Sequence, residues 1–523
     1  MDAIRSLSRI NLASGQVRAA LVATFSTLII GTLVLPTLLT PRYRLWGISG
    51  ARDALKHFYL DEARREREKK IELERWMDSE RAFSWQRLLK NIGPPNFNPG
   101  CVVASPSKVD PNYWYQWTRD SAMVFKVIIE YWKRDLHSAG REKTEKLIMD
   151  YIQETMKLQR LETLVGGFKT GGLGEVKYNI DGTPFNGRWT RPQNDGPALR
   201  SIALIGFANA LSDINPSKWE DLVRSQIYDS LDYASTESIV KADLDYICEV
   251  WNTPSWDLWE EVKGLHHFNM LVSLRALLDG CEFAARLGDS VSAKRYKKVS
   301  KEIEEGLERF WDDEKGYLLA TIKPENKTKK ISWLDTGTVL GFIHSGSPFG
   351  TEWLGSDRSL ATTHAIGVSM RHEYSLNRRC YPVSKGFAGY AIGRYCEDAY
   401  DGDGKVKTCI GNPWYLCTLA HAEFYYRLIP HFASQSINVN SVNELFYMDL
   451  ARFFNVTGVD GKPLKAGQSY PAGSKGHLDL LDAFRARGDA FVAVVKDNAR
   501  WNGGLWEQFD RNNGRELGAP DLT

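Results

Sequence analysis

From about residue 85 onward, the sequence alternates between two kinds of segment. Stretches such as 121–131, 268–278 and 414–423 place apolar residues three to four positions apart, the spacing that gathers them on one face of a helix. Between these stretches lie long loops rich in Gly, Asn, Pro and aromatic residues, and the two-residue alternation of a half-buried strand is scarce. The sequence therefore predicts an all-α body in which rigid helices hold a loop-built site at one end.

The aromatic residues are the part of the composition that bears most on function. The chain has 17 Trp and 22 Tyr, and the apolar faces of sugar rings stack well on such broad, flat side chains. The alternative for any one of these rings is a place in a large helical core. The charges balance, with 67 basic and 65 acidic residues, so the chain as a whole is not drawn to nucleic acid or anionic surfaces. A neutral polymer fits better as the partner.

Seven Cys residues occur, and no two of them form a C-x-x-C pair. The sequence therefore suggests neither a zinc site nor a redox motif, and we expect no metal ion. Cys409 and Cys417 are close enough in sequence for one disulfide. Buried free thiols are the favoured interpretation for most of the seven.

The N-terminal region differs from the rest of the chain. Residues 19–41 contain no charged side chain, and at ~1.5 Å per residue a helix of this length crosses a ~30 Å hydrocarbon layer. The residues at its end are poor for signal-peptide cleavage. We therefore expect a short tail (1–18), an uncleaved transmembrane anchor (19–41) and a charged helical stalk (42–84).

Two short triplets bear on which side of the membrane the body lies. Asn326-Lys327-Thr328 and Asn455-Val456-Thr457 fit the pattern of N-glycosylation acceptors. Together with the apolar segment, they favour a body in the secretory pathway, whether lumenal, vacuolar or extracellular, and a cytoplasmic N-terminus. We expect the chain to be a single-pass, membrane-anchored monomer.

The loops between the predicted helices contain the candidate chemical groups. In the loop 251–264, the carboxyl groups of Asp257, Glu260 and Glu261 lie among three Trp residues. A carboxyl set against indoles loses solvation, which raises its pKa, and a glycosidase needs such a group to protonate the leaving oxygen. The alternative is a solvated acidic helix face. The Gly-rich run 171–174 lacks the ending of a phosphate-binding loop, so we reject that interpretation.

Two further loops pair a guanidinium with a carboxylate beside aromatic rings. They contain Arg119 with Asp120 and Arg394 with Asp398. Each pair can bond several hydroxyls of one sugar, and the alternative is an ion pair that fixes the start of a helix. Glu507 lies in a Gly- and aromatic-rich loop near the end of the chain and is the candidate second carboxylate.

These loops resemble those of the fungal and yeast glucoamylases, glycoside hydrolase family 15, from about residue 84 to the last residue. The segment 253–264 is similar to the W-E-E signature of the family's active site. Y-x-W-T-R-D, W-x-R-P-Q-x-D-G-P-A-L-R, G-R-Y-x-E-D-x-Y and G-N-P-W also match, in the family's order. The resemblance implies an (α/α)6 barrel, a six-hairpin toroid, over 85–523. It also implies an inverting exo-hydrolase that removes α-1,4-linked glucose from the non-reducing ends of starch, glycogen or malto-oligosaccharides, without a cofactor.

Residue roles follow from the resemblance, position by position. It implies that Glu260 is the general acid, Glu507 the general base and Asp257 a supporting member of the catalytic group. Residues implied to hold the terminal glucose are Trp117, Arg119, Asp120, Arg394 and Asp398. Residues implied to line the adjacent pocket are Tyr113, Lys177, Trp189 and Glu261, and Trp414 of the G-N-P-W match is also taken as substrate-binding.

The sequence departs from the family pattern in three places. Cys396 stands where many relatives have Pro, and the connection 401–410 is longer than in several relatives. Relatives continue past D-L-T into a final helix, so the expected barrel lacks its last helix. Two alternatives stay open: a catalytically impaired glycan-binding protein with the same cleft, and another (α/α)6 enzyme such as a trehalase, against which the W-E-E signature argues.

Overall fold

A computed structural model of the protein describes residues 41–135, 138–229, 231, 238–346, 354–383, 386–402, 410–454, 456–458, 461, 463–500 and 503–522. For residues 41–63 and 138–139 it describes the backbone alone. The predicted tail (1–18) and all but the last residue of the predicted anchor (19–41) lie outside these ranges. Among the helices that are described, none combines the length and the apolar composition needed to span a bilayer.

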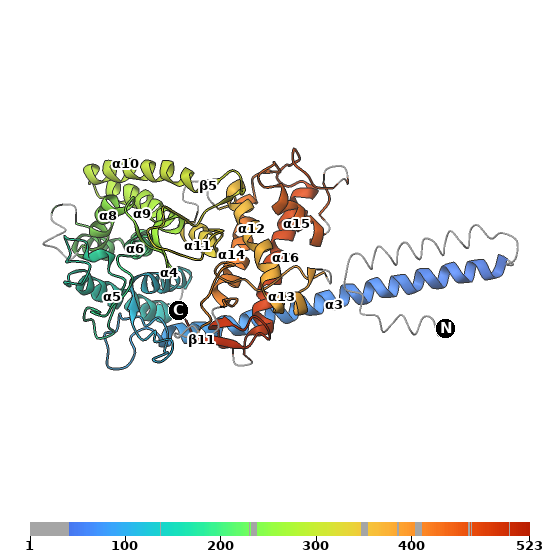
Figure 1. Ribbon diagram of the computed structural model, residues 1–523, viewed down its shortest axis with the longest axis horizontal. Coiled ribbons are helices and arrows are strands. Elements are labelled where there is room, and N and C mark those ends of the chain that lie inside the picture. Colours follow the sequence, from blue (N-terminus) through green and yellow to red (C-terminus); the bar gives the residue numbers. More distant parts are fainter. Residues whose placement is uncertain are drawn as a thin grey trace.

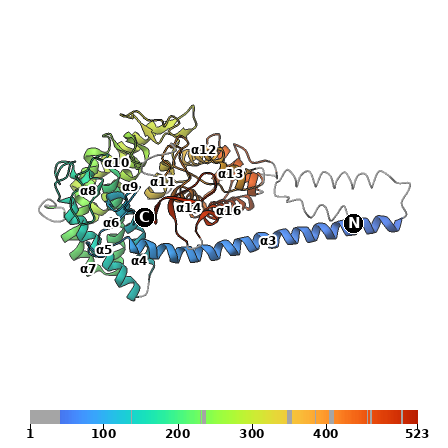
Figure 2. The same ribbon diagram turned by 60° about the horizontal axis from the view of Figure 1, so that its bottom comes forward.

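Two sets of helices alternate along the chain and build the body. In the inner set, each helix packs against the next one in the series. These helices are α4 (Thr118–Arg134), α6 (Asp195–Ile214), α9 (His267–Arg286), α11 (Thr336–Ser345) and α14 (Tyr415–Phe432). The outer set packs on the outside of these: α5 (Ser138–Gln159), α8 (Ile239–Val250), α10 (Ser290–Leu307), α12 (Asp357–Glu373) and α16 (Lys475–Asn498). This inner–outer alternation, visible in Figures 1 and 2, agrees with the predicted (α/α)6 architecture.

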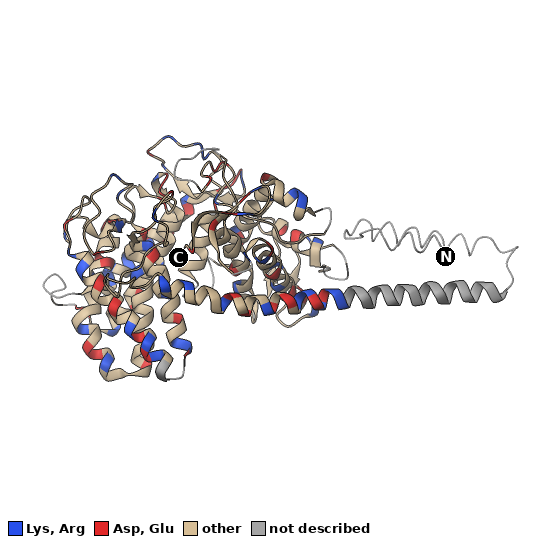
Figure 3. Ribbon diagram, turned by 90° about the horizontal axis from the view of Figure 1, so that it is seen from below, with Lys and Arg blue, Asp and Glu red and all other residues tan. Residues whose placement is uncertain are grey.

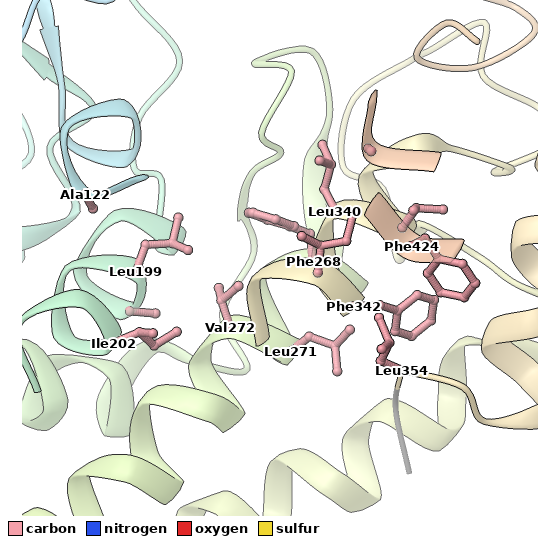
Figure 4. Packing of buried hydrophobic residues seen from close by; sticks show 14 of the residues in the cluster. Ala122, Leu199, Ile202, Phe268, Leu271, Val272, Leu340, Phe342, Leu354 and Phe424 are labelled. Atoms are coloured by element: carbon pink, nitrogen blue, oxygen red, sulfur yellow. The ribbon is translucent and has the colours of Figure 1, made fainter. Parts of the chain in front are cut away.

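Burial explains which helices are inside. Fifteen of the 20 residues of α6 and nine of the ten of α11 are buried, as expected of a helix that is apolar on nearly every side. The outer helix α10 instead buries one stripe, in which Tyr296, Val299 and Ile303 lie three to four residues apart. Figure 4 shows the resulting core, where side chains from α4, α6, α9, α11 and α14 meet.

Apart from the N-terminal helix, the remaining described elements are short. The short helices are α7 (Pro216–Leu222), α13 (Ser375–Cys380) and α15 (Glu444–Phe454), with 3-10 turns at Gly172–Gly174 and Glu308–Phe310 and a π turn at Val223–Ile227. The strands, all antiparallel, form β1 (Gln116–Trp117) with β2 (Lys177–Tyr178), β3 (Ser255–Trp256) with β4 (Lys263–His266) and β7 (Thr321–Ile322), β5 (Trp311–Asp312) with β6 (Tyr317–Leu318), β8 (Ile437–Asn438) with β9 (Ser469–Tyr470), and β10 (Trp506–Phe509) with β11 (Glu516–Pro520). Most are two residues long, which is too short to leave an alternating pattern in the sequence.

The residues of the predicted stalk lie within α3 (Pro41–Lys90), a 50-residue helix. Figures 1 and 2 show α3 running along the body and projecting beyond it. Charges of both signs mark its described side chains (Figure 3). Its last turns belong to the body: Glu72 pairs with Lys496 of α16 at 2.8 Å, and Trp85 stacks on Tyr131 of α4 with 3.9 Å between ring centroids. The helix therefore continues past residue 84, where the sequence placed the end of the stalk.

Of the five inner helices named above, α4, α6, α9 and α14 are entered from predicted site loops, whereas α11 follows the connection after β7. The residues that precede α4, α9, α11 and α14 are Trp117, His266, Asp335 and Trp414, and α6 follows Asn194. Because the inner helices alternate with outer helices that run back, their N-termini gather at one end of the barrel. The fold therefore brings loops that are hundreds of residues apart in sequence to one place.

Candidate active site

One pocket of about 220 Å³ lies where these loops meet. Nine of the predicted site residues line it: Tyr113, Trp117, Arg119, Asp120, Glu260, Glu261, Arg394, Trp414 and Glu507. Apolar side chains from three inner helices complete the wall, namely Met123 of α4, Leu340 of α11 and Leu416 of α14. The pocket is thus charged and aromatic on its loop side and apolar on its helix side.

Glu260 projects from the hairpin 257–262 between β3 and β4. Its backbone φ is +65°, a left-handed conformation that L-residues adopt at a cost of roughly 1–2 kcal/mol. The Asp257 carboxylate supports this turn from below, because its Oδ1 accepts the backbone N–H of Glu261 at 2.7 Å and of Val262 at 2.9 Å. Asp257 is buried and does not line the pocket. The structure therefore places this residue under the hairpin, where it supports Glu260 and does not face a ligand.

Three N–H donors converge on the Glu260 carboxylate. Trp117 Nε1 and Gln193 Nε2 donate to Oε1 at 2.8 and 2.9 Å, and Trp189 Nε1 donates to Oε2 at 2.7 Å. Both carboxylate oxygens are therefore held in fixed directions, and 17% of the Glu260 side-chain surface stays exposed. The carboxyl is oriented by protein and still open to the pocket.

Lys177 lies beside this group inside a cage of aromatic rings. Its ammonium is 3.2 Å from the ring centroid of Trp189 and 4.3 Å from that of Trp117. Burial lowers the pKa of Lys177 to about 7, although the nearby Glu260 carboxylate favours the charged form. Lys177 and Trp189 do not line this pocket, although Trp189 bonds the Glu260 carboxylate directly.

Glu507 is the second carboxylate in the pocket and has a different environment. It lies in β10, is 1% exposed, and accepts hydrogen bonds from Tyr113 Oη at 2.9 Å and Tyr400 Oη at 3.0 Å. Burial raises the pKa of Glu507 to about 7, and the two phenols act in the opposite direction. Two carboxyl groups with distinct surroundings thus share one pocket.

Arg394 ties together three of the predicted residues. Its Nε and Nη2 donate to the two oxygens of Asp398 at 2.8 and 2.6 Å, and Nη2 also donates to Glu261 Oε1 at 2.8 Å. Asp398 is almost fully buried behind the guanidinium, so only Arg394 and Glu261 of this group reach the pocket wall. A bidentate pair of this kind fixes the direction of the remaining N–H groups.

Arg119, in the first turn of α4, also lines the pocket. Its Nη1 donates to Asp195 Oδ2 at 2.9 Å and to Gln193 Oε1 at 2.7 Å. Asp120 lies 3.8 Å from Arg119 Nε, and burial raises the pKa of Asp120 to about 6. Arg119, Asp120 and Arg394 all border the pocket, so they can contact a ligand in addition to forming their ion pairs.

The aromatic wall contains a buried donor without a hydrogen-bond partner in the described part of the chain. Trp414 is 5% exposed and lies 5.6 Å from Trp259 and 6.0 Å from Tyr400, measured between ring centroids. Its Nε1 has no hydrogen-bond partner among the described residues. A buried donor costs free energy unless it is paired.

Several site residues were missed by sequence reasoning. Tyr400 binds Glu507, Gln193 binds Glu260, and Tyr395 Oη donates to Glu261 Oε2. Tyr400 and Tyr395 lie in the G-R-Y-x-E-D-x-Y run and Gln193 in the W-x-R-P-Q run, so their place in matched segments was the available signal.

Cys417 is a buried free thiol, and Cys409 lies outside the described residues.

The charged groups of the site are arranged for direct contact with an organic ligand. In the described part of the chain, no three His, Cys, Asp or Glu side chains gather in a way that could hold a metal ion. The pocket carboxylates are instead engaged by indole, guanidinium and phenol donors. A carboxyl pair in one pocket can deliver a proton to one atom and remove a proton from another, which is what acid–base hydrolysis of a glycoside requires.

Comparison with known proteins identifies what this chain is similar to. The sequence profile of Glycosyl hydrolases family 15 matches residues 82–523. A probable glucoamylase of Schizosaccharomyces pombe is 33% identical over 463 residues, covering 87% of this chain and 90% of that protein. Among solved structures, the family 15 glucoamylase of Hypocrea jecorina superposes with a TM-score of 0.74 at 34% identity, over 86% of this chain and 70% of that one. The glucoamylase of Saccharomycopsis fibuligera gives a TM-score of 0.73 at 29% identity, over 86% and 92%.

Proposed function

The chain belongs to glycosyl hydrolases family 15, and from this membership we propose that Glu260 and Glu507 perform an inverting hydrolysis at the non-reducing ends of α-1,4-glucans. The reaction class, exo-hydrolysis of terminal glucose from α-glucans, follows from the family and from the glucoamylases that the chain resembles. The observation that supports the assignment of the two residues is their meeting in one pocket with different surroundings.

The reaction requires two proton transfers, one to the leaving oxygen and one from the attacking water. Glu260 donates its proton to the glycosidic oxygen as the bond between that oxygen and C1 breaks, and the shortened glucan leaves as an alcohol. Glu507 removes a proton from a water molecule as the water oxygen bonds to C1 from the opposite face. The configuration at C1 inverts, so an α-linked glucose leaves as β-D-glucose. After release, the proton gained by Glu507 and that lost by Glu260 are exchanged with solvent.

The charged groups of the pocket recognise the terminal glucose. Arg119, Asp120 and Arg394 present donors and acceptors to its hydroxyls, and Asp398 keeps Arg394 in place. Trp117 and Trp414 offer flat apolar surfaces to sugar faces. Glu261, Lys177, Trp189 and Tyr113 flank the two catalytic carboxyls, where the bond to be cleaved must lie.

The product anomer tests this proposal. We expect the purified protein to release glucose from maltose and soluble starch, with β-D-glucose seen first by proton NMR before mutarotation. Release of α-D-glucose as the first product would contradict the roles given to Glu260 and Glu507. A folded protein that binds malto-oligosaccharides and releases no glucose would instead favour the glycan-binding alternative.

The pH dependence of the reaction should report the Glu507–Tyr113 hydrogen bond. The base acts in its ionised form, and the phenol of Tyr113 stabilises that form, which lowers the pKa of Glu507. Tyr113→Phe should therefore raise this pKa and move the acid limb of kcat/KM to higher pH. On that limb we expect roughly a tenfold loss of kcat/KM, since a hydrogen bond to a charged group contributes ~1.5–3 kcal/mol.

A pH–rate profile of the two proteins on maltose makes this measurement, because kcat/KM reports the ionisation of the free enzyme. Tyr400→Phe should shift the limb in the same direction, since Tyr400 bonds the other oxygen of Glu507. An unchanged acid limb in both variants would show that Glu507 does not control it.

For location, we propose a membrane-anchored enzyme with its body on the lumenal or extracellular side. The support is the uncharged segment 19–41 together with the projecting helix α3, which begins at its end. Retention of the full chain in membranes after alkaline carbonate washing, with the body protected from protease in intact microsomes, is the expected result. Release by the wash or digestion from the cytosolic side would overturn it.

A further inference from the structure

The segment 323–330, which follows β7, lies against the hairpin that presents Glu260. The contact is made by the side-chain amide of Asn326, which is partly buried. Its Oδ1 accepts the backbone N–H of Lys263 at 2.7 Å, and its Nδ2 donates to the backbone carbonyl of Glu261 at 2.9 Å. One side chain thus bonds the backbone on both sides of Val262, at the end of the hairpin.

The amide of Asn326 bonds the backbone just beyond the point where the pairing of β4 with β7 ends. β4 pairs with β7 at Leu265 and His266, and the chain beyond β7 then bends, with φ of +50° at Lys323. Past this bend, the N–H of Glu325 donates to the carbonyl of Lys263 at 2.7 Å. Asn326 extends the same edge by two further bonds and so continues the backbone pairing to the residue next to Glu260.

The segment itself is fixed at both ends. Its start follows the β4–β7 pairing, and its end is held by the buried Lys330, whose Nζ pairs with Asp335 at 2.6 Å. Between these points, Lys263 Nζ and Glu325 Oε2 form an ion pair at 2.7 Å. The segment that contains Asn326 is therefore fixed in place, so its side chain can support the hairpin.

The peptide groups after Glu260 are consequently held from two directions. Asp257 Oδ1 accepts the N–H of Glu261 from inside the hairpin, and Asn326 Nδ2 donates to the C=O of Glu261 from outside. Such support has a physical reason, because Glu260 is kept at a positive φ that surrounding contacts must maintain. A small rotation of these peptides would move the Glu260 carboxyl relative to the bond it protonates.

We propose that Asn326 is a positioning residue for the reaction, which holds the Glu260 hairpin in the geometry needed for proton donation. The inference rests on the proposed function, since it takes Glu260 as the acid. Asn326 also begins the triplet Asn326-Lys327-Thr328, so Nδ2 is the atom to which a glycan would be joined. The test must therefore separate the amide from a glycan.

Asn326→Ala and Thr328→Ala provide that separation in the full-length protein. Asn326→Ala removes the amide and the acceptor triplet, whereas Thr328→Ala removes the triplet and keeps the amide. We expect Asn326→Ala to lower kcat on maltose by ~10–100-fold with KM within about threefold, since small misplacements of a catalytic group have effects of this size. Thr328→Ala should stay within about threefold of the wild type in both constants.

An aryl α-glucoside with an acidic leaving phenol gives the second measurement, because its departure needs little proton donation. A residue that positions the acid should matter less here, so the kcat of Asn326→Ala should recover to within about fivefold of the wild type. Equal losses in Asn326→Ala and Thr328→Ala would assign the effect to a glycan and overturn the proposal. Wild-type kcat in Asn326→Ala would overturn it as well, and so would equal losses on both substrates, which indicate general damage to the fold.

Glu260→Gln, assayed in parallel, keeps the two levels of inference apart. If Glu260→Gln is inactive on maltose and Asn326→Ala is fully active, the positioning role is wrong and the proposed function stands. If Glu260→Gln retains near-full activity, the assignment of Glu260 is wrong, whatever Asn326→Ala does.

Discussion

Replacing Glu260 with Gln should lower kcat on maltose by ~10²–10⁴-fold, the usual contribution of a general acid. The amide has nearly the same shape as the carboxyl and keeps one acceptor oxygen, although its NH2 faces an N–H donor, and it cannot give up a proton at the pH of the reaction. KM should change little, because the groups that bind the terminal glucose hydroxyls come mainly from Arg119, Asp120 and Arg394. Steady-state kinetics with maltose, together with thermal unfolding of both proteins, make this measurement.

The leaving group distinguishes loss of an acid from general damage to the site. With an aryl α-glucoside whose phenol is already acidic, the departing phenolate needs no proton from the enzyme. The loss in Glu260→Gln should therefore shrink to about tenfold or less. A variant that keeps near-full activity on maltose contradicts the role of Glu260, and so does one that loses activity equally on both substrates.

The helices of the body were accessible to sequence reasoning because their determinants are local, whereas the barrel arrangement was implied by the family resemblance. A helix such as α10 can be recognised by apolar residues that recur at helical spacing and form one buried stripe. The helix α6 can be recognised by apolar residues on nearly all of its sides. The two-residue strands carry no such signal, since they are held by pairing with distant segments. The contacts of α3 with α16 and α4 could not be predicted either, because they are tertiary and leave no break in helix propensity at residue 84.

The site was accessible in its chemistry and inaccessible in its geometry. Matched segments led to both carboxyls and to the charged and aromatic residues around them. The support of these residues could not be predicted, because it depends on contacts between loops. Asp257 lies in the same acidic run as Glu260 but faces the backbone, and Asn326 is separated from the hairpin by more than 60 residues. A triplet that indicates a glycan acceptor in sequence thus turns out, in the fold, to touch the hairpin of the proposed acid.

Replacing Glu507 with Ala should also lower kcat by ~10²–10⁴-fold, but for a different reason. The attacking water loses the group that accepts its proton. Unlike Glu260→Gln, this variant should gain little from an activated leaving group, since departure of the leaving group is not what it lacks. Comparison of maltose with the aryl α-glucoside measures this difference. A large recovery on the aryl substrate would mean that Glu507 acts on the leaving group and that the two roles are exchanged.

Azide gives the decisive test of the base, because it is a nucleophile that carries no proton to be removed. The truncated side chain in Glu507→Ala leaves space beside Tyr113 and Tyr400, whose phenols bonded the lost carboxylate and can orient an anion there. Azide should then attack C1 from the face used by water while Glu260 protonates the leaving oxygen, and β-D-glucosyl azide should form. We expect azide to restore activity at least ~10-fold on maltose in Glu507→Ala and not in Glu260→Gln, in which proton donation is still missing. Formation of α-D-glucosyl azide, or equal rescue of both variants, would contradict attack from the Glu507 side.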